Sequence, residues 1–546
     1  MKKGVIALVF FSFIFIPSWA CTNLLVGKAA SVDGSAMITY SADSYSLYGE
    51  LYHWPAKTYP EGEMLDVYEW DTGKLLGRIP QVKQTHNVVG NMNEHQLCIG
   101  ETTFGGRKEL TDSTGIMDYG SLIYITLQRA KTAREAIQIM TDLVSEFGYY
   151  SEGESFSIAD PEEVWIMEMI GKGPGRKGAV WVAVRIPDDC ISAHANQARI
   201  QQFPLNDPQN CIYSKDVISF AREKGYFSGK DPDFSFAKAY NPLDFGGLRY
   251  CEARVWSFFN RFHKEAAKWI DYAKGESTVP MPLYLKPDRK LGVKDLMEMM
   301  RNHYEGTELD ATLDIGAGPF HSPYRFSPLQ WKVGEVEYCF ERPISTQQTG
   351  FTFIGQVRNY LPNEVGGVLW FGTDDARFTV YTPMYACMTT IPESYRCGNG
   401  DLYTYSPTSA FWLHNQVANT AYSRYNQIIQ DTKPVQEKLE NGFLLMQDPI
   451  EQKAAEIAKT DKKQAIEFLT EYSHDQAEKA FRTWKNLGEK ILVKYIDGVI
   501  KKEENGQFKR NEYGQPAYPE RPVYDEEYYK LIIRETGNKL KVKEIK

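Results

Sequence analysis

The sequence predicts an α+β protein with a helical C-terminal region, and three patterns along the chain lead to this fold class. Short apolar runs separated by Gly, Pro, Asn and Asp turns continue from Cys21 to about Met446, as is typical of β-strands. Apolar residues at helical spacing interrupt these runs. Beyond Asp448 the composition changes to Ala, Glu, Lys and Gln. Strands and helices in separate runs favour an α+β layered fold over a regular βαβ alternation.

The expected elements follow from these patterns in chain order. Strands are predicted in TNLLVGKAAS (22–31), QLCIGETTF (96–104), EVWIMEMI (163–170) and AVWVAVRI (179–186). One helix is predicted over 121–147 and a shorter one over 292–303. Near the C-terminus, apolar residues recur at helical spacing at Ala477, Ala480, Phe481, Trp484, Ile491, Tyr495 and Val499. We expect this apolar face to pack on the β-rich body, with a lid or an oligomer contact as the alternative, and an irregular connection over 503–522.

Residues 1–20 have the pattern of a signal peptide. Lys2 and Lys3 precede an apolar run from Val5 to Ile16, and the segment ends in the small-x-small triplet Ser18-Trp19-Ala20. The apolar run is shorter than the roughly 20 residues that a bilayer-spanning helix needs, and no later segment is long and apolar enough. We therefore expect export to the periplasm or the medium with signal peptidase as a partner, a main domain over 21–446 and a helical region over 447–546.

Charge and composition restrict the classes of partner. The formal net charge is -9, and loss of Lys2 and Lys3 with the signal peptide would make the chain more acidic. Without a basic stripe or tail, nucleic acid is not an expected partner. The pairs Cys190 with Cys211 and Cys387 with Cys397 are candidate disulfides for an exported chain. No CxxC or HExxH spacing occurs, so the sequence predicts no metal and no cofactor.

Cys21 follows the predicted cleavage point and has three possible roles: lipid anchor, disulfide partner or catalytic residue. If processing leaves Cys21 first, its thiol and α-amine belong to one residue, and the amine's ordinary pKa of about 7.7 to 8.0 suits a general base. Such an amine can take the thiol proton directly or through one water, without a histidine. The bulky Trp19 fits the lipoprotein signal badly.

Several motifs in order support the catalytic role. They are CTNLLVGKAASVDGSAMITYSADS (21–44), VVGNMNEHQLCIGETTF (88–104), ISAHANQARI (191–200), LRYCEARVW (248–256), RNHYEGTELD (301–310) and RPISTQQTGFTFIGQVRNYLPNEVGGVLWFG (342–372). From Cys21 to about Tyr395 the chain resembles the N-terminal-cysteine dipeptidases of the dipeptidase A type. These belong to the N-terminal-nucleophile hydrolases, together with penicillin V acylase and the bile-salt hydrolases. The resemblance implies a four-layer αββα sandwich over residues 21–446.

The resemblance also implies roles for individual residues. Cys21 resembles the family's nucleophile, and Asp43 resembles the acid that orients the α-amine. Asn196 resembles the oxyanion-hole amide, and Arg254 resembles the arginine that lowers the thiol pKa or stabilises charge. For Asp43, Asn196 and Arg254, the alternatives are a capping residue, a loop asparagine and a surface ion pair.

One position departs from the family pattern. Many relatives have arginine where this chain has Tyr40, so Arg254 alone supplies the positive field or Tyr40 contributes a hydroxyl. Glu101, Thr102 and Thr103 are expected to line the substrate cleft together with Tyr40.

These expectations describe an exported cysteine amide hydrolase that acts on dipeptides or another small amide. The alternatives are an acylase on a non-peptide amide, of the penicillin V or bile-salt type, and a lipid-anchored binding protein. The oligomeric state and the side-chain preference stay open.

Overall fold

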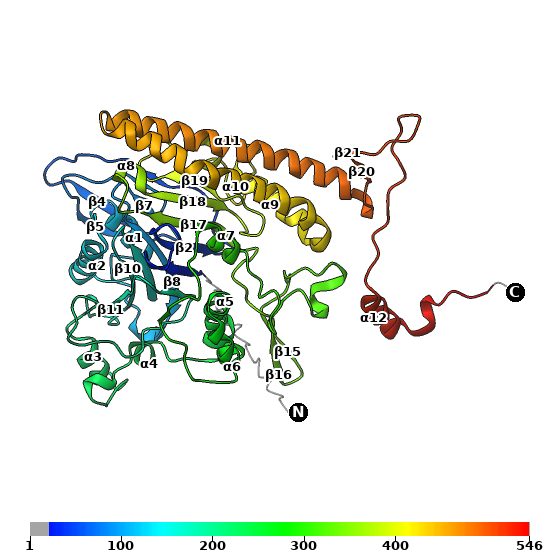
Figure 1. Cartoon of the computed structure of the whole chain (residues 1–546). Coiled ribbons are helices and arrows are strands. Elements are labelled where there is room, and N and C mark those ends of the chain that lie inside the picture. The colour runs from blue at the N-terminus through cyan, green and yellow to red at the C-terminus, as the bar shows by residue number, and fades with distance from the viewer. Residues whose placement is uncertain (1–20, 545–546) are drawn as a thin grey trace, which may run out of the picture.

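Two antiparallel sheets form the centre of the molecule in the computed structural model, which describes residues 21–544 (Figure 1). The signal peptide expected over residues 1–20 lies outside the described residues. The seven-stranded sheet has the order β14 (Tyr284–Leu285), β12 (Ile191–His194), β1 (Asn23–Val26), β2 (Ala36–Asp43), β17 (Thr349–Val357), β18 (Val368–Thr373) and β19 (Thr382–Tyr385). The eight-stranded sheet has the order β13 (Cys211–Tyr213), β11 (Ala179–Ile186), β10 (Val164–Gly171), β9 (Gly153–Ala159), β8 (Cys98–Gly105), β7 (Met92–Asn93), β6 (Val88–Val89) and β3 (His53–Trp54).

Three two-stranded hairpins and a set of helices complete the described chain. The hairpins are β4–β5 (Met64–Tyr68, Leu75–Pro80), β15–β16 (Gln330–Val333, Val336–Cys339) and β20–β21 (Glu503–Glu504, Gln507–Phe508). The helices are α1 (Tyr119–Leu127), α2 (Ala133–Phe147), α3 (Val217–Glu223), α4 (Phe236–Tyr240), α5 (Ala253–Phe262), α6 (Ile270–Lys274), α7 (Val293–Met300), α8 (Asn363–Gly366), α9 (Ala410–Tyr422), α10 (Tyr425–Ala458), α11 (Lys462–Tyr495) and α12 (Glu526–Thr536). The predicted α+β class with a helical C-terminal region is confirmed.

Strand β2 lies at the centre of the molecule, where the two sheets and their covering helices meet. It is buried along its whole length and pairs with β1 and β17. Strands β8 and β9 of the other sheet and helix α7 also contact it. Helices α1 and α2 contact the eight-stranded sheet, whereas α9 and α11 contact the seven-stranded sheet. This arrangement is consistent with the expected sandwich, because layers covered on both sides require apolar residues in both directions.

The single helix predicted over 121–147 is wrong, because the chain forms α1 and α2 with a break between them. The side-chain amide of Asn93 donates hydrogen bonds to the carbonyls of Leu127 and Ala130, at 2.7 and 2.8 Å, and so satisfies carbonyls after the end of α1. Thr132 then caps α2 by accepting a hydrogen bond from the backbone N–H of Glu135. The Thr-x-x-Glu signal of a helix start was present in the sequence.

The C-terminal helices lie over the seven-stranded sheet, as Figure 1 shows for α10 and α11. Ala477, Ala480, Trp484 and Ile491 of α11 are buried, so the expectation that this apolar face packs on the body is confirmed. Helix α10 runs through residue 446, where the sequence suggested a domain boundary, and it contains Pro434 and Pro449. Because proline usually ends a helix, the sequence did not predict the part of α10 before residue 446. The domain division itself stays a prediction.

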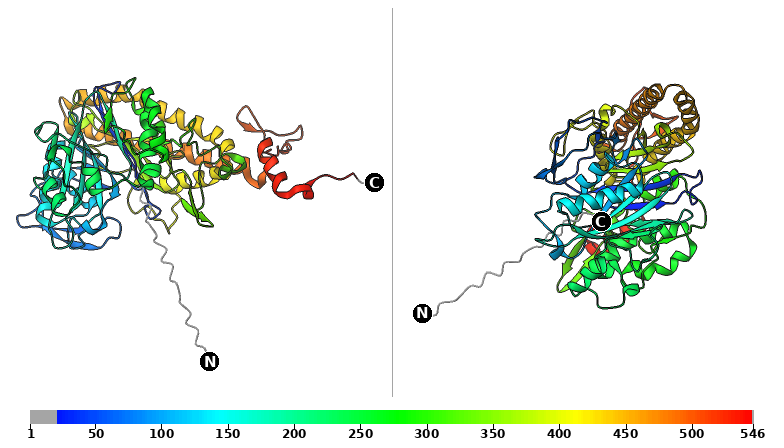
Figure 2. Two further views of the ribbon diagram at one scale, coloured as in Figure 1. Left: turned by 90° about the horizontal axis from the view of Figure 1, so that it is seen from below. Right: turned by 90° about the vertical axis from the view of Figure 1, so that its left-hand side faces the viewer.

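The last part of the described chain projects from this body (Figure 2). It contains the short β20–β21 hairpin within the segment expected to be irregular, and helix α12, which has no buried residue. His321 and Asp525 form an ion pair between this segment and the body, with 3.0 Å between Nε2 and Oδ2. Within residues 21–544 no helix is both long enough and apolar enough to span a membrane.

The candidate disulfides are not formed, because all eight cysteines of the chain are free thiols. Cys190 precedes β12 in one sheet, whereas Cys211 begins β13 in the other. Cys387 is buried, and the thiol of Cys397 instead faces the carbonyl of Leu51 at 3.8 Å. Closeness in sequence therefore did not bring either pair together.

Candidate active site

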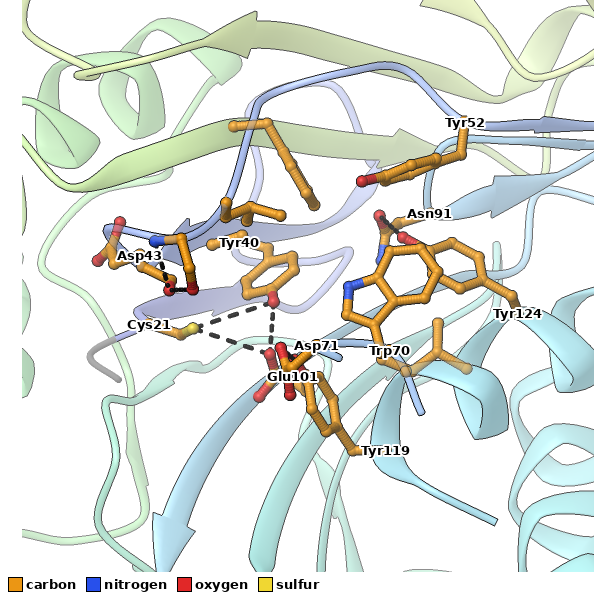
Figure 3. Close-up of a pocket in the computed structure, with 17 residues that line it drawn as sticks. Cys21, Tyr40, Asp43, Tyr52, Trp70, Asp71, Asn91, Glu101, Tyr119 and Tyr124 are labelled. Atoms are coloured by element: carbon orange, nitrogen blue, oxygen red, sulfur yellow. Dashed lines mark hydrogen bonds between the residues drawn. The ribbon is translucent and has the colours of Figure 1, made fainter. Parts of the chain in front are cut away.

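Cys21 lies at a pocket of about 310 Å³, whose wall combines aromatic rings and carboxylates (Figure 3). Tyr40, Asp43 and Glu101 line this pocket together with Cys21. The volume is at the lower end of the range for small-molecule sites, which suits a compact ligand. Four of the eight residues that the sequence assigned to the site therefore meet at one cavity.

The β1–β2 pairing brings Cys21 beside Asp43. The two strands are antiparallel, so the residues before β1 lie opposite the end of β2. Thr22 and Ser41 exchange backbone hydrogen bonds of 3.4 and 3.0 Å, which continues the ladder to the pocket. The position of Cys21 is thus set by a hairpin within the first part of the described chain.

Asp43 is fully buried and held by residues far away in the chain. Its Oδ2 accepts a hydrogen bond from Arg342 Nη2 at 2.7 Å, and its Oδ1 accepts one from the Thr349 hydroxyl at 2.7 Å. Burial raises the pKa of the Asp43 carboxyl, and the Arg342 guanidinium opposes this by lowering the pKa. Sequence reasoning missed Arg342, although it is the first residue of the matched motif 342–372.

Tyr40 and Glu101 approach the thiol from the two sheets. The Tyr40 hydroxyl donates a short hydrogen bond to Glu101 Oε1, and the Cys21 Sγ lies 3.9 Å from Tyr40 Oη and 3.7 Å from Glu101 Oε1. Gly100 permits this contact, because a Cβ there would lie 2.7 Å from Asn23 Nδ2 and 3.2 Å from Tyr40 Cβ. Tyr40 therefore contributes a hydroxyl beside the thiol.

The surroundings of Cys21 disfavour a spontaneously ionised thiol. Burial raises its pKa well above the ordinary value, and the negative charges of Glu101 and Asp43 raise the pKa further. Hydrogen bonds from the Asp43 backbone and the Tyr40 hydroxyl lower it by less. A reaction that uses this thiol as a nucleophile needs a base to remove its proton.

Arg254 contacts the backbone of Cys21. It belongs to α5, directly after the π-helical turn Gly247–Glu252. Its Nη1 donates to the Cys21 carbonyl at 2.6 Å and to the Thr22 hydroxyl at 2.8 Å, and its Nη2 donates to Asn196 Oδ1 at 3.0 Å. The guanidinium therefore holds the end of β1 and orients the Asn196 amide.

Asn196 and the two threonines lie around the pocket rather than in its lining. The Asn196 Nδ2 donates to the Thr103 carbonyl at 2.7 Å, and the residue has a positive φ of 63°. The Thr103 hydroxyl donates to Glu154 at 2.7 Å, and the Thr102 hydroxyl bonds to His194 Nδ1 at 2.7 Å. Within residues 21–544 the lining of this cavity includes none of these residues.

Histidine is not the neighbour of the thiol. Across the described chain, no histidine, lysine or arginine lines the pocket. His194, the histidine nearest to a matched motif, is buried, and its Nε2 bonds to the Ser157 hydroxyl at 2.7 Å. Burial lowers the pKa of His194 to about 3, so it is neutral and engaged on both sides.

Sequence reasoning missed two carboxyl groups. Glu154 is buried beside Glu101, and burial together with the Glu101 charge raises its pKa well above the ordinary value. Asp71, in the β4–β5 turn, reaches the pocket and accepts a hydrogen bond from the Tyr119 hydroxyl at 3.0 Å. No motif marked either residue, because their neighbours in space come from distant strands and helices.

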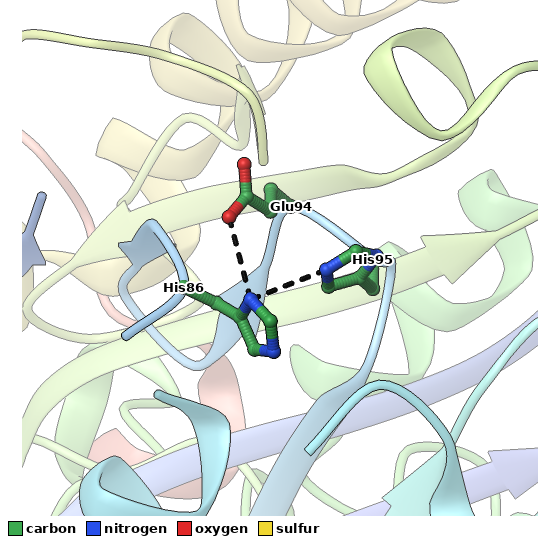
Figure 4. Close-up of side chains that lie close together, drawn as sticks. All are labelled: His86, Glu94 and His95. Carbon is green, nitrogen blue, oxygen red and sulfur yellow. Dashed lines mark hydrogen bonds and ion pairs between the residues drawn. The ribbon is translucent and has the colours of Figure 1, made fainter. Parts of the chain in front are cut away.

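One group of side chains away from the pocket has the donor types of a metal site (Figure 4). His86 Nδ1 lies 3.2 Å from His95 Nε2 and 3.6 Å from Glu94 Oε1. These distances are compatible with the edges of a tetrahedral site. A chain of hydrogen bonds through His86 accounts for them equally well.

Comparisons with known proteins identify relatives that match most of the chain. A probable dipeptidase of Latilactobacillus sakei is 26% identical over 484 residues, covering 84% of this chain and 92% of the relative. A probable dipeptidase of Salmonella dublin is 28% identical over 390 residues, covering 68% and 81%. A probable dipeptidase B of Streptococcus pyogenes serotype M1 is 24% identical over 501 residues, covering 87% and 93%. The model of Peptidase family C69 matches residues 20–438, a span that includes Cys21, Asp43, Glu101 and Arg342, and the chain therefore belongs to this family of peptidases.

Proposed function

We propose that this peptidase is an exported dipeptidase whose Cys21, exposed by cleavage after Ala20, acts as an N-terminal nucleophile. The observation that carries the proposal is the setting of the Cys21 thiol. It faces a pocket lined by carboxylates and aromatic rings, and no histidine of the described chain lies there. The α-amine of Cys21, which belongs to the same residue as the thiol, then serves as the base. We assign the two stacked sheets and their covering helices to the αββα fold of the N-terminal-nucleophile hydrolases.

The reaction has two steps. The α-amine takes the thiol proton, and Sγ attacks the acyl carbonyl of the dipeptide. The resulting tetrahedral oxyanion collapses to a thioester as the C–N bond breaks, and the leaving amine takes the proton from the α-ammonium. The same amine then deprotonates a water molecule, which hydrolyses the thioester and releases the N-terminal amino acid with a free thiol.

The neighbouring residues have distinct roles in this proposal. Asp43, fixed by Arg342, orients the α-amine and stabilises its protonated form. The Asn196 amide uses one N–H toward Thr103 and keeps a second N–H for the oxyanion. Arg254 positions Cys21 by donating a hydrogen bond to its carbonyl.

A glycine inserted between Ala20 and Cys21 tests the proposal. The thiol stays, but its own amine becomes an amide without a basic lone pair, and the new amine lies about 3.8 Å further along the chain. We expect dipeptide hydrolysis to fall on the order of 100-fold or more. The mass of the mature N-terminus must first show that processing leaves Gly-Cys in the variant and Cys21 in the parent.

The partner measurement is His194→Ala. High activity in the glycine insertion together with an inactive His194 variant would overturn the N-terminal mechanism. A diacylglycerol on Cys21 would instead support a lipid-anchored binding protein. Hydrolysis of penicillin V or a conjugated bile acid without release of amino acids from dipeptides would favour an acylase.

A further inference from the structure

The pocket at Cys21 has an excess of negative charge that the proposed reaction does not use. Asp43, Asp71 and Glu101 line it, and no lysine or arginine of the described chain does (Figure 3). The charge of Asp43 is matched by Arg342, at 2.7 Å and nearly fully buried. Glu101 and Asp71 have no such cation in the pocket lining, so a ligand with a positive group would complete the site.

Glu101 is arranged as an acceptor. The Tyr40 hydroxyl donates to its Oε1, and the neighbouring carboxyl of Glu154 has a pKa raised well above the ordinary value by burial and by the Glu101 charge. Burial raises the pKa of the Glu101 carboxyl as well, and its hydrogen bonds with Tyr40, Glu154 and the Cys21 thiol lower this pKa. These hydrogen bonds favour the charged form of the Glu101 carboxylate, which lines the pocket.

Asp71 and the aromatic rings extend this acidic end. Asp71 lies at the mouth of the pocket in the β4–β5 turn, bonded to Tyr119. The ring of Trp70 lies 4.6 Å from that of Tyr124 and 4.9 Å from that of Tyr52. Aromatic faces attract a cation through their negative π-systems, in addition to the two carboxylates.

The distance between Glu101 and the Cys21 thiol allows one amino acid to contact both. A carbonyl carbon ready for attack lies about 3 to 3.5 Å from Sγ. In an amino acid the α-nitrogen is about 2.5 Å from its own carbonyl carbon, as the standard bond lengths and angle give. Glu101 Oε1 is 3.7 Å from Sγ, so an α-nitrogen can reach it while the carbonyl faces the thiol.

We propose that Glu101 and Asp71 form a binding site for the free α-ammonium group of the residue that is transferred to Cys21. This inference rests on the proposed function and narrows its substrate class to small peptides with an unblocked N-terminus. An N-acylated or otherwise neutral acyl group leaves the charge of Glu101 unpaired in a buried site, which disfavours binding. This ammonium site would favour dipeptides over the N-acyl substrates of an acylase in the same pocket.

Matched substrates test the site. L-Alanyl-L-alanine and propionyl-L-alanine have the same scissile bond and differ by the ammonium group alone. We expect kcat/KM of the parent enzyme to favour L-alanyl-L-alanine by about 100-fold or more. Asp71→Asn should reduce this ratio by about tenfold or more, with little change for propionyl-L-alanine. Glu101→Gln should also reduce the ratio by about tenfold or more; because Glu101 lies beside the Cys21 thiol, only the ratio of the two substrates is compared for this variant. Glu162→Gln, an exposed glutamate outside the pocket, should leave the ratio unchanged.

Three outcomes would overturn the inference. Equal losses on both substrates in Glu101→Gln, which leave their ratio unchanged, would assign this residue to the thiol. A parent enzyme that hydrolyses both substrates equally through Cys21 would keep the proposed function and remove the ammonium site. A ratio unchanged in Asp71→Asn, whose exposed turn should tolerate the substitution, would remove Asp71 from the site.

Discussion

The two sides of Cys21 differ in charge and in how their charges are used. On the backbone side, Arg254 holds the Cys21 carbonyl and Arg342 holds Asp43, so both cations are engaged with fixed protein groups. On the pocket side, Glu101 and Asp71 face a cavity without a cation in its described lining. The arginines thus build the framework of the site, while the carboxylates face the ligand. A thiol between them is not activated by a positive field, and the predictions below test this division.

The largest effect is expected when the Cys21 thiol, which lies between the arginines and the pocket carboxylates, is removed. Cys21→Ala should lower kcat for dipeptides on the order of 1,000-fold or more, because it removes the nucleophile. The small change in volume should leave the unfolding midpoint in urea close to that of the parent. Turnover above a few per cent of the parent rate would mean that another residue carries the chemistry.

The backbone side is tested by Arg342→Met. The variant leaves the buried carboxyl of Asp43 without its counter-charge, which should cost about 3 to 5 kcal/mol of unfolding free energy. Urea denaturation measures this loss. The double variant with Asp43→Asn should recover part of the stability, because no uncompensated charge is left, but no activity. Recovery of activity in the double variant would contradict a role for the Asp43 charge.

Substitution of Asn196, whose amide is held by Arg254, tests whether this amide takes part in the reaction. Asn196→Ala should lower kcat by about 100- to 1,000-fold with a smaller change in KM, as expected for an oxyanion donor. The residue has a φ of 63°, which glycine adopts without strain, so Asn196→Gly is the matched control. Equal losses in both variants point to the amide, whereas an active glycine variant would point to backbone strain.

The smallest effect is expected for the pH dependence of KM, through the Asp71 carboxyl in the pocket. Partial burial raises the pKa of Asp71 to about 7; the charges of Glu101, Asp118 and Glu69 raise the pKa as well, and the Tyr119 hydrogen bond lowers it. Below pH 7 Asp71 is protonated and loses its attraction for an ammonium group, so KM should rise several-fold on the acid side. Asp71→Asn should abolish this acid-side change. A KM for L-alanyl-L-alanine that does not change between pH 6 and 7.5 in the parent enzyme would contradict a role for the Asp71 charge in binding.

Several features of the site followed from short stretches of sequence. The predicted strand over 96–104 includes Glu101, and the predicted strand over 22–31 begins next to Cys21; the structure brings both residues to one pocket. The helix boundary after Leu127 was not predicted, although Thr132 and Glu135 carry the local signal of a helix start. Where local signals decide, the sequence was sufficient.

Other features depend on contacts between distant residues. Arg342 pairs with Asp43 from 299 positions away, and Arg254 reaches the Cys21 carbonyl from 233 positions away. Neither arginine shows in its own neighbourhood which atom it will contact. The same holds for Thr102, whose hydroxyl bonds to His194 across the two sheets instead of lining the cavity.

The sequence by itself determined the α+β class and the family, and it supplied the candidate catalytic residues, because hydrophobic periodicity and motifs are written in consecutive residues. Tertiary structure alone decided which partner each charged group receives. Charges act over a few ångströms in space and not along the chain, so the stacking of two sheets put the arginines behind Cys21 and the carboxylates in front of it. That arrangement, and the acidic pocket it creates, is a property of the fold.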